Sequence, residues 1–218
     1  MTRVKICCIR SIEEAQLAIR HGAAAVGLVS EMPTGNRGIA DTRIREIAQA
    51  IPPGVSSFLL TSRIDPEGII DHQRRTLVNT IQLVDRVSPA DVVRVKNALP
   101  GISVVQVVHV NDTTAVTDAD SYASIVDALL LDSGTPDGPV RTLGGTGRTH
   151  DWKLSRQIVR QARCPVFLAG GLDPLNVASA IRDVGPFGVD ICSGLRPHGS
   201  LDASLLCSFL SAVQGAAA

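Results

Sequence analysis

Three glycine-rich segments form the clearest chemical pattern in this sequence. Gly144-Gly145-Thr146-Gly147 precedes an expected helix, whereas Gly170-Gly171 and Ser193-Gly194 each follow a short apolar run. Backbone N–H groups beside glycine can approach an anion closely, and a helix N-terminus adds the positive end of its dipole. Each segment alone is also ordinary turn sequence, but the three together favour a phosphate-binding site. No Lys-Ser/Thr pair follows the first segment and no strand leads into a GxGxxG turn, which excludes a P-loop and a dinucleotide fingerprint.

Cys7 and Asp132 are the candidates for acid–base chemistry. Cys7 ends an apolar run and can serve as a thiolate base, although a lone cysteine in such a run is more often an inert core residue. Asp132 directly follows Ala-Leu-Leu-Leu, where a carboxylate is costly unless it lies at an open rim. Arg37, in a Gly-Asn-Arg-Gly loop, is either a bidentate carboxylate ligand or a solvated loop residue.

The elements that must position these residues follow from an alternation of short β-branched runs and amphipathic stretches. Strands are expected at 4–7, 25–28, 57–60, 80–83, 102–108, 128–131, 166–169 and 189–191. Helices are expected at 11–21, 41–50, 65–75, 114–123, 152–162, 173–183 and 201–213, with a further one opening at Ser88-Pro89. In the first helix, Ser11 is the expected N-cap, Glu14 completes a capping box and Gly22 ends the helix.

Strands that alternate with helices predict right-handed βαβ crossovers and a parallel sheet. Eight such units in 218 residues fit a closed (β/α)₈ TIM barrel, and no composition break divides residues 1–218 into two domains. The active site of such a barrel lies at the C-terminal ends of the strands, and phosphate often binds after strands seven and eight. Cys7, Asp132 and the two later glycine segments all fall at these ends.

Charge and composition exclude several classes of partner. The 21 Lys and Arg balance the 21 Asp and Glu, and six aromatic residues offer no stacking platform, so no nucleic-acid partner is expected. No apolar run approaches the ~18–20 residues of a membrane span, and the N-terminus lacks the apolar region of a signal peptide. Five cysteines, mostly inside apolar runs, indicate a reduced cytoplasmic protein without a disulfide framework. No metal site or Ser-His-Asp arrangement is expected, since the histidines at 109, 150 and 198 each stand alone.

Five segments carry a family signature. They are Val-Lys-Ile-Cys at 4–7, Leu-Leu-Leu-Asp-Ser at 129–133, Gly-Gly-Thr-Gly-Arg-Thr-His-Asp-Trp at 144–152, Leu-Ala-Gly-Gly-Leu-Asp-Pro-Leu-Asn-Val at 168–177 and Phe-Gly-Val-Asp-Ile-Cys-Ser-Gly at 187–194. In this order and register they resemble the phosphoribosylanthranilate isomerase family of tryptophan biosynthesis, whose fold is the (β/α)₈ barrel.

The resemblance implies a cofactor-free Amadori rearrangement of a small phosphorylated substrate. Asp132 would be the general acid that opens the furanose ring, and Cys7 the general base that removes the C2′ proton. Arg37 would hold the anthranilate carboxylate. The phosphate would lie on Gly145, Thr146, Gly147, Gly170, Gly171, Ser193 and Gly194. A monomer or a homodimer is expected.

The sequence departs from the family pattern on the side of the aglycone. Cys8 stands where the family has glycine, and Val84-Asp85 replaces a His-Gly pair. The loop at 31–36 lacks the usual aromatic residues. Two alternatives therefore stay open: a paralogous enzyme acting on another phosphorylated sugar or amine conjugate, and a barrel that binds a phosphorylated ligand without turnover.

Overall fold

The computed structural model describes residues 1–32, 38–134 and 150–216. Within these residues, eight parallel strands pair in chain order and close into a barrel. The strands are β1 (Arg3–Ile6), β2 (Ala25–Val29), β3 (Ser56–Thr61), β4 (Thr80–Leu83), β5 (Ser103–His109), β6 (Ala128–Asp132), β7 (Val166–Leu168) and β8 (Gly188–Ile191). The predicted (β/α)₈ TIM barrel is confirmed.

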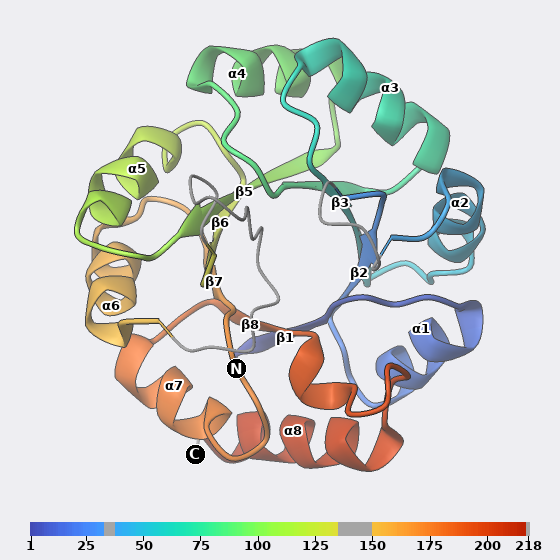
Figure 1. The fold of residues 1–218 in the computed structure, drawn as a ribbon, viewed down its shortest axis with the longest axis vertical. Helices are drawn as coiled ribbons and strands as arrows, with labels where there is room; N and C mark the ends of the chain where they lie inside the picture. The colour runs from blue at the N-terminus through green and yellow to red at the C-terminus, as the bar shows by residue number, and fades with distance from the viewer. Residues whose placement is uncertain (33–37, 135–149, 217–218) are drawn as a thin grey trace.

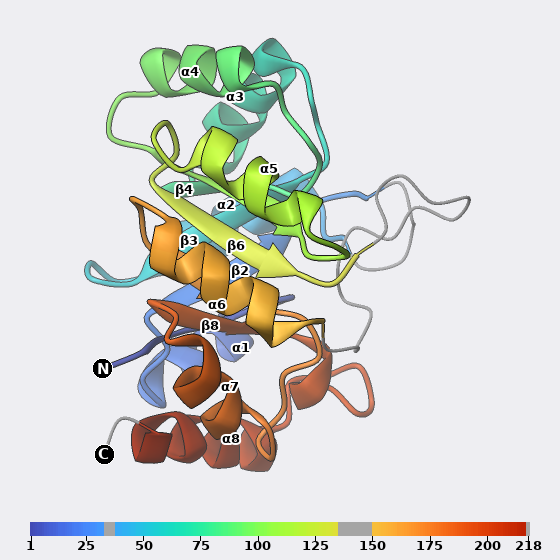
Figure 2. The same cartoon turned by 90° about the vertical axis from the view of Figure 1, so that its left-hand side faces the viewer.

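The α-helices form a ring around the strands, as Figure 1 shows. They are α1 (Ile12–Arg20), α2 (Asp41–Gln49), α3 (Pro66–Thr76), α4 (Pro89–Ala98), α5 (Thr114–Tyr122), α6 (Trp152–Gln161), α7 (Val177–Val184) and α8 (Ala203–Ala216). A short 3₁₀ helix, η1 (Ser193–Leu195), follows β8. Figure 2 shows both termini at one end of the barrel, opposite to the end toward which β6 points.

Two apolar layers explain why these sequences adopt this arrangement. Side chains alternate between the two faces of each strand. Outward residues such as Leu28 and Leu59 are fully buried against helix residues such as Ile44 and Ile69. A second cluster fills the barrel interior, and it includes Cys7, Ala25, Phe58, Leu60, Val84, Val105, Val107, Ala128, Leu130, Phe167 and Ala169. The interior is therefore packed, and a ligand has room only at its ends.

The ends of α1 match the prediction only in part. Ser11 caps the helix, because its Oγ accepts a hydrogen bond from the backbone N–H of Glu14 at 3.2 Å, and Gly22 follows the C-cap with a φ of 99°. The predicted capping box is wrong, since the Glu14 carboxylate instead accepts the N–H of Arg10 and two hydrogen bonds from Arg196, each at 2.9 Å. A guanidinium brought from the loop after β8 offers the carboxylate a stronger, bidentate partner.

The start of α7 also differs from the prediction. The helix begins at Val177 and not at Asp173. Asp173 Oδ1 accepts the N–H groups of Leu175 and Asn176, which holds this segment in a turn before the helix. Such local side-chain bonds compete with helix formation. The turn extends the loop that follows β7, where one of the glycine pairs lies.

Candidate active site at the C-terminal ends of the strands

Cys7 lies directly after β1, at the C-terminal end of the barrel. Its N–H donates to the carbonyl of Ile191 at 2.8 Å, and its thiol is buried in the interior cluster. β6 ends on Asp132, which pairs in register with His109 of β5. Because Asp132 is two positions beyond the interior residue Leu130, alternation directs its half-buried side chain inward. The two predicted acid–base residues thus lie on the inner face of the same rim.

The local environment of Cys7 contains two charged groups. Lys5, two residues earlier on β1, is fully buried and forms an ion pair with Asp190 at 2.9 Å that lacks the alignment of a hydrogen bond. Burial raises the pKa of the Cys7 thiol to about 11; Lys5 acts to lower this pKa and Asp190 to raise it. Neither Lys5 nor Asp190 was predicted as a site residue. Their signal in the sequence is a charged residue inside each of two apolar strands.

Gly170 and Gly171 adopt a backbone that other residues rarely take, with φ values of 81° and 63°. A Cβ at Gly170 would lie 3.0 Å from both Nδ1 of His150 and the backbone N of Ser133, so the loop after β7 packs closely on the residue that follows Asp132. Ser133 in turn donates its N–H to Asp132 Oδ1 at 2.7 Å.

The loops after β7 and β8 are in direct contact. A Cβ at Gly194 would collide with the carbonyl oxygen of Leu172, so only glycine allows this approach. Two of the three predicted phosphate segments, Gly170-Gly171 and Ser193-Gly194, are therefore brought together. The third, with Gly145, Thr146 and Gly147, lies outside the described residues, as does Arg37.

His150 is a further residue of this region that was not predicted as a site residue. Its Nε2 contacts Ser155 Oγ at 2.6 Å, and burial lowers the pKa of the imidazole to about 4. The ring is therefore neutral near pH 7 and adds no positive charge to the glycine loops. In the described part of the chain, no group of three or more His, Cys, Asp or Glu side chains is arranged to hold a metal ion.

A disulfide joins Cys8 to Cys192, and the expectation of a protein without disulfides is wrong. The bond links the residue after Cys7 to the residue before Ser193, over a Cα–Cα distance of 5.9 Å. The two cysteines are 184 positions apart, and only the pairing of β1 with β8 in the closed barrel makes them neighbours. Cys8 has a φ of 61°, in the left-handed region that glycine adopts most easily.

The replacement of the family's His-Gly pair has a defined structural outcome. Val84 belongs to the interior cluster, and its carbonyl lies 3.2 Å from Nε2 of His109, an inward rim residue of β5. A histidine side chain therefore reaches the segment after β4 from the neighbouring strand. The carboxylate of Asp85 is buried and accepts the N–H of Arg86 at 3.0 Å, so its charge is partly compensated by the local backbone.

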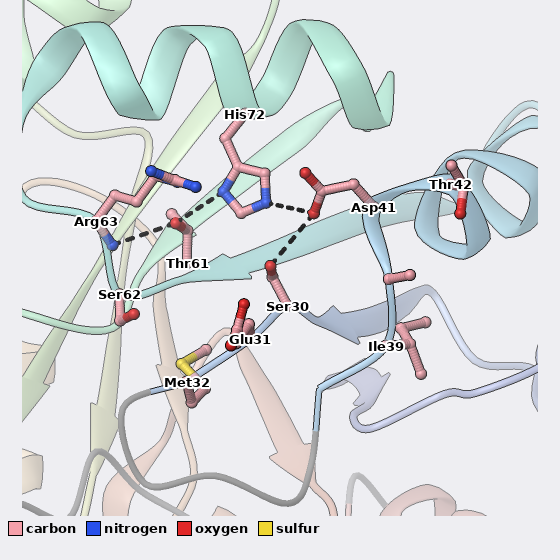
Figure 3. A pocket seen from close by; sticks show the side chains of 11 residues that line it. Ser30, Glu31, Met32, Ile39, Asp41, Thr42, Thr61, Ser62, Arg63 and His72 are labelled. Atoms are coloured by element: carbon pink, nitrogen blue, oxygen red, sulfur yellow. Dashed lines mark hydrogen bonds and ion pairs between the residues drawn. The ribbon is translucent and has the colours of Figure 1, made fainter.

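A pocket of about 590 Å³ lies beside the ends of β2 and β3 (Figure 3). His72 of α3 lines this pocket and bridges two other lining residues. Its Nδ1 lies 3.0 Å from Thr61 Oγ1, and its Nε2 lies 3.0 Å from Asp41 Oδ1. Because an ionised carboxylate only accepts, Nε2 carries the proton and Nδ1 accepts from the threonine. Met32 contributes to this pocket and packs on the interior cluster that holds Cys7. The pocket therefore borders the rim.

Comparison with known proteins establishes the family. The family model described as N-(5'phosphoribosyl)anthranilate (PRA) isomerase matches residues 4–212. This chain is a member of the PRA isomerase family. A curated PRA isomerase of Methanocella arvoryzae is 36% identical over 196 residues, covering 90% of both chains. A PRA isomerase of Halobacterium salinarum is 36% identical over 213 residues, 97% of this chain and 95% of that one.

Solved structures of PRA isomerases have the same fold. The crystal structure from Thermotoga maritima superimposes with a TM-score of 0.85 at 32% identity, covering 99% of this chain and all of that one. Another, in complex with reduced 1-(o-carboxyphenylamino)-1-deoxyribulose 5-phosphate, gives a TM-score of 0.82 at 29% identity, with 99% and 100% coverage. None of the helices described for this PRA isomerase family member has the length and apolar character needed to cross a membrane.

Proposed function

We propose that this protein isomerises N-(5'-phosphoribosyl)anthranilate to 1-(o-carboxyphenylamino)-1-deoxyribulose 5-phosphate in tryptophan biosynthesis. Membership of the PRA isomerase family supports the reaction. The assignment of residues rests on one observation, which is that Cys7 and Asp132 lie at the same end of the barrel. Cys7 follows β1 and Asp132 ends β6, and the contacting loops after β7 and β8 lie beside them.

In the proposed mechanism, Asp132 is the general acid and Cys7 the general base. Asp132 protonates the ring oxygen of the ribose, and the C1′–O bond breaks to leave a Schiff base. The Cys7 thiolate then removes the C2′ proton, and the electron pair of the C–H bond moves toward the nitrogen. The resulting enolamine tautomerises to the ketone. An acid and a base on different strands of one rim can serve two atoms of one sugar chain without moving.

The phosphate of the substrate is proposed to lie on the loops after β7 and β8. Gly170 and Gly171 adopt the left-handed conformation, and Gly194 permits the close contact between the loops. Backbone N–H groups beside such glycines can approach an anion closely. By family resemblance, Gly145, Thr146 and Gly147 join them, with Ser193, and Arg37 holds the anthranilate carboxylate. The aglycone would then lie toward β2 and β3, where Met32 borders the pocket.

The decisive experiment combines turnover with complementation. Purified protein is expected to consume the fluorescent substrate and to restore tryptophan-free growth to an isomerase-deficient bacterium. Cys7→Ser and Asp132→Asn should each lower kcat by roughly 10²–10⁴. Cys164→Ser, at a free half-buried cysteine, is the matched control and should retain full activity. Folded wild-type protein without turnover would refute the proposal.

Failure of that experiment would leave the two alternatives to be distinguished. Turnover of another phosphorylated sugar or amine conjugate, lost in Cys7→Ser, would favour a paralogous enzyme, whereas protection of the rim by phosphate without turnover of any such conjugate would favour a binding barrel. The substitutions that favour this second candidate are Cys8, Val84 and Asp85, which all lie at the ends of β1 and β4. The presence of Cys7, the proposed general base, argues against a protein that only binds its ligand, because binding alone needs no base.

We further propose that the protein works in the cytoplasm as a monomer or a homodimer. Monomers have been generated from the dimeric phosphoribosylanthranilate isomerase of Thermotoga maritima and crystallised, so both states occur for that relative. Three of the described cysteines, Cys7, Cys164 and Cys207, are unpaired, whereas Cys8 and Cys192 are bonded to each other. Light scattering of the purified protein tests the assembly. Thiol trapping in intact cells tests whether Cys8 and Cys192 are bonded there.

A further inference from the structure

We propose that Lys5 is a positioning residue that stabilises the thiolate of Cys7, and that Asp190 limits the strength of this effect. The catalytic part of this inference rests on the proposed function, in which Cys7 is the base. The electrostatic part concerns only the protein and is testable without substrate.

Lys5 and Cys7 approach the same point inside the barrel. Lys5 is on β1, and Cys7 follows β1 directly and continues its extended alternation, with one residue between the two, so both side chains point inward. A Cβ placed on Gly27 of β2 would lie 2.9 Å from Cys7 Sγ and 3.1 Å from Lys5 Nζ. The thiol and the ammonium therefore share the space that the absent side chain leaves. Gly27 is the residue that permits this juxtaposition.

Asp190 supplies the counter-charge from the neighbouring strand. It pairs in register with Lys5 across β1 and β8, and its Oδ1 is 2.9 Å from Nζ. The ammonium also lies 5.2 Å from the centre of the Phe58 ring, a favourable cation–π distance. The lysine is fully buried, and Asp190 raises its pKa while burial acts in the opposite direction, with a net rise. Lys5 is therefore a fixed positive charge.

A buried ion pair in a barrel interior is a poor way to gain stability. Replacing such a pair by apolar residues of similar size is often neutral or stabilising. Apart from the uncharged residues Thr80 and Gln82, which pair in register with Phe58 and Leu60, most of the barrel interior is filled by apolar side chains. Lys5 and Asp190 lie next to Cys7, the free thiol described at this rim. A role in stabilising the thiolate of Cys7 explains why this charged pair is present.

The proposed reaction requires that the thiolate of Cys7 be stabilised. Even with Lys5 in place, burial holds the pKa of Cys7 at about 11, so near pH 7 about one molecule in 10⁴ carries the thiolate, and without Lys5 this fraction would be smaller still. A base must be unprotonated before it can accept the C2′ proton. When the reaction occurs, the C2′–H bond breaks, an S–H bond forms and the electron pair neutralises the iminium nitrogen. An adjacent ammonium favours the thiolate that begins this step.

No other titratable group among the described residues competes at this position. The neighbouring strands present Ala25 and Gly27 from β2 and Phe58 from β3, and none of these ionises. Cys8 and Cys192 are joined in the disulfide and do not titrate. Lys5 and Asp190 are the charged residues that act on the thiol, in opposite directions.

Lys5 and Asp190 shift the pKa of Cys7 in opposite directions, and this difference provides the test. Lys5→Met removes the stabilising charge and should raise the pKa of Cys7, so less thiolate forms at any given pH, whereas Asp190→Asn should lower this pKa. The thiolate is measured by its absorbance near 240 nm, as the difference between each variant and the same variant carrying Cys7→Ser. In turnover, Lys5→Met should lower kcat at pH 7 by roughly 10- to 10³-fold with little change in KM. The acid limb of its kcat profile should move up with the thiol pKa.

A double variant keeps the test decisive if Lys5→Met does not fold. Lys5→Met/Asp190→Leu contains no buried charge, and its Cys7 pKa should exceed that of the wild type, because the effect of Lys5 on the thiol is larger than that of Asp190. Shifts of the same sign in the Lys5 and Asp190 variants, or an unchanged thiol titration in the double variant, would overturn the inference. A shifted titration in a protein without isomerase activity would overturn the proposed function alone.

Discussion

Reduction of the Cys8–Cys192 disulfide is expected to destabilise the whole barrel. The bond joins residues 184 positions apart, close to the full length of the chain. In the chain-entropy model, closing a loop of this size lowers the entropy of the unfolded state enough to stabilise the fold by about 5 kcal/mol.

In a chain of this size, a loss of about 5 kcal/mol should lower Tm by roughly 10–20 °C. The assay is thermal unfolding followed by circular dichroism, with and without a phosphine reductant. Cys8→Ser/Cys192→Ser should melt at the temperature of the reduced wild type and should not respond to reductant. Cys164→Ser, which leaves the bond intact, should still respond. A reductant effect below about 2 °C on the wild type would refute the reasoning, because the loop entropy would then be absent.

Two further substitutions test the packing of the site. Gly170→Ala should cost about 1–3 kcal/mol of stability and weaken the binding of inorganic phosphate. The reason is that this position has a φ of 81° and that a Cβ there would press on neighbouring atoms. Gly215→Ala is the control and should cost nothing, because no atom lies within 4 Å of the new Cβ. Glu14→Gln should cost about 2–3 kcal/mol in urea unfolding at pH 7, since it leaves the buried Arg196 without its carboxylate. Burial acts to raise the pKa of Glu14, but the hydrogen bonds that Glu14 accepts and the charge of Arg196 together lower it more, so the net shift is downward. The loss of stability in Glu14→Gln should therefore be complete above the ordinary pKa of glutamate. It should vanish as the pH falls through the lowered pKa of Glu14 in the folded protein. Glu46→Gln, at an exposed ion pair, is the control and should change stability by less than about 1 kcal/mol at either pH.

Much of the fold was predictable because its signals are local. Helix α4 begins at Pro89 behind an N-cap at Ser88, as the Ser-Pro pair predicts, since a hydroxyl cap and a proline first residue act within one turn. The strand at Thr80–Leu83 has the predicted bounds, because the short run of alternating polar and apolar residues between Asn79 and Asp85 has few alternatives. The predicted capping box failed because a distant partner intervened: the Glu14 carboxylate binds Arg196 from the far end of the chain. The predicted start of α7 failed for a local reason, since Asp173 holds the preceding segment in a turn.

The sequence by itself determined the barrel, the rim at which chemistry is expected and the candidate pair Cys7 and Asp132. Strand–helix alternation, the direction of parallel strands and family motifs are all properties of the linear order of residues. Only the tertiary structure decided what surrounds that pair. Closure of β1 against β8 creates the Cys8–Cys192 bond and sets Lys5 beside Asp190. No local pattern encodes a contact between residues at the two ends of a chain, because such a contact exists only once the barrel has closed.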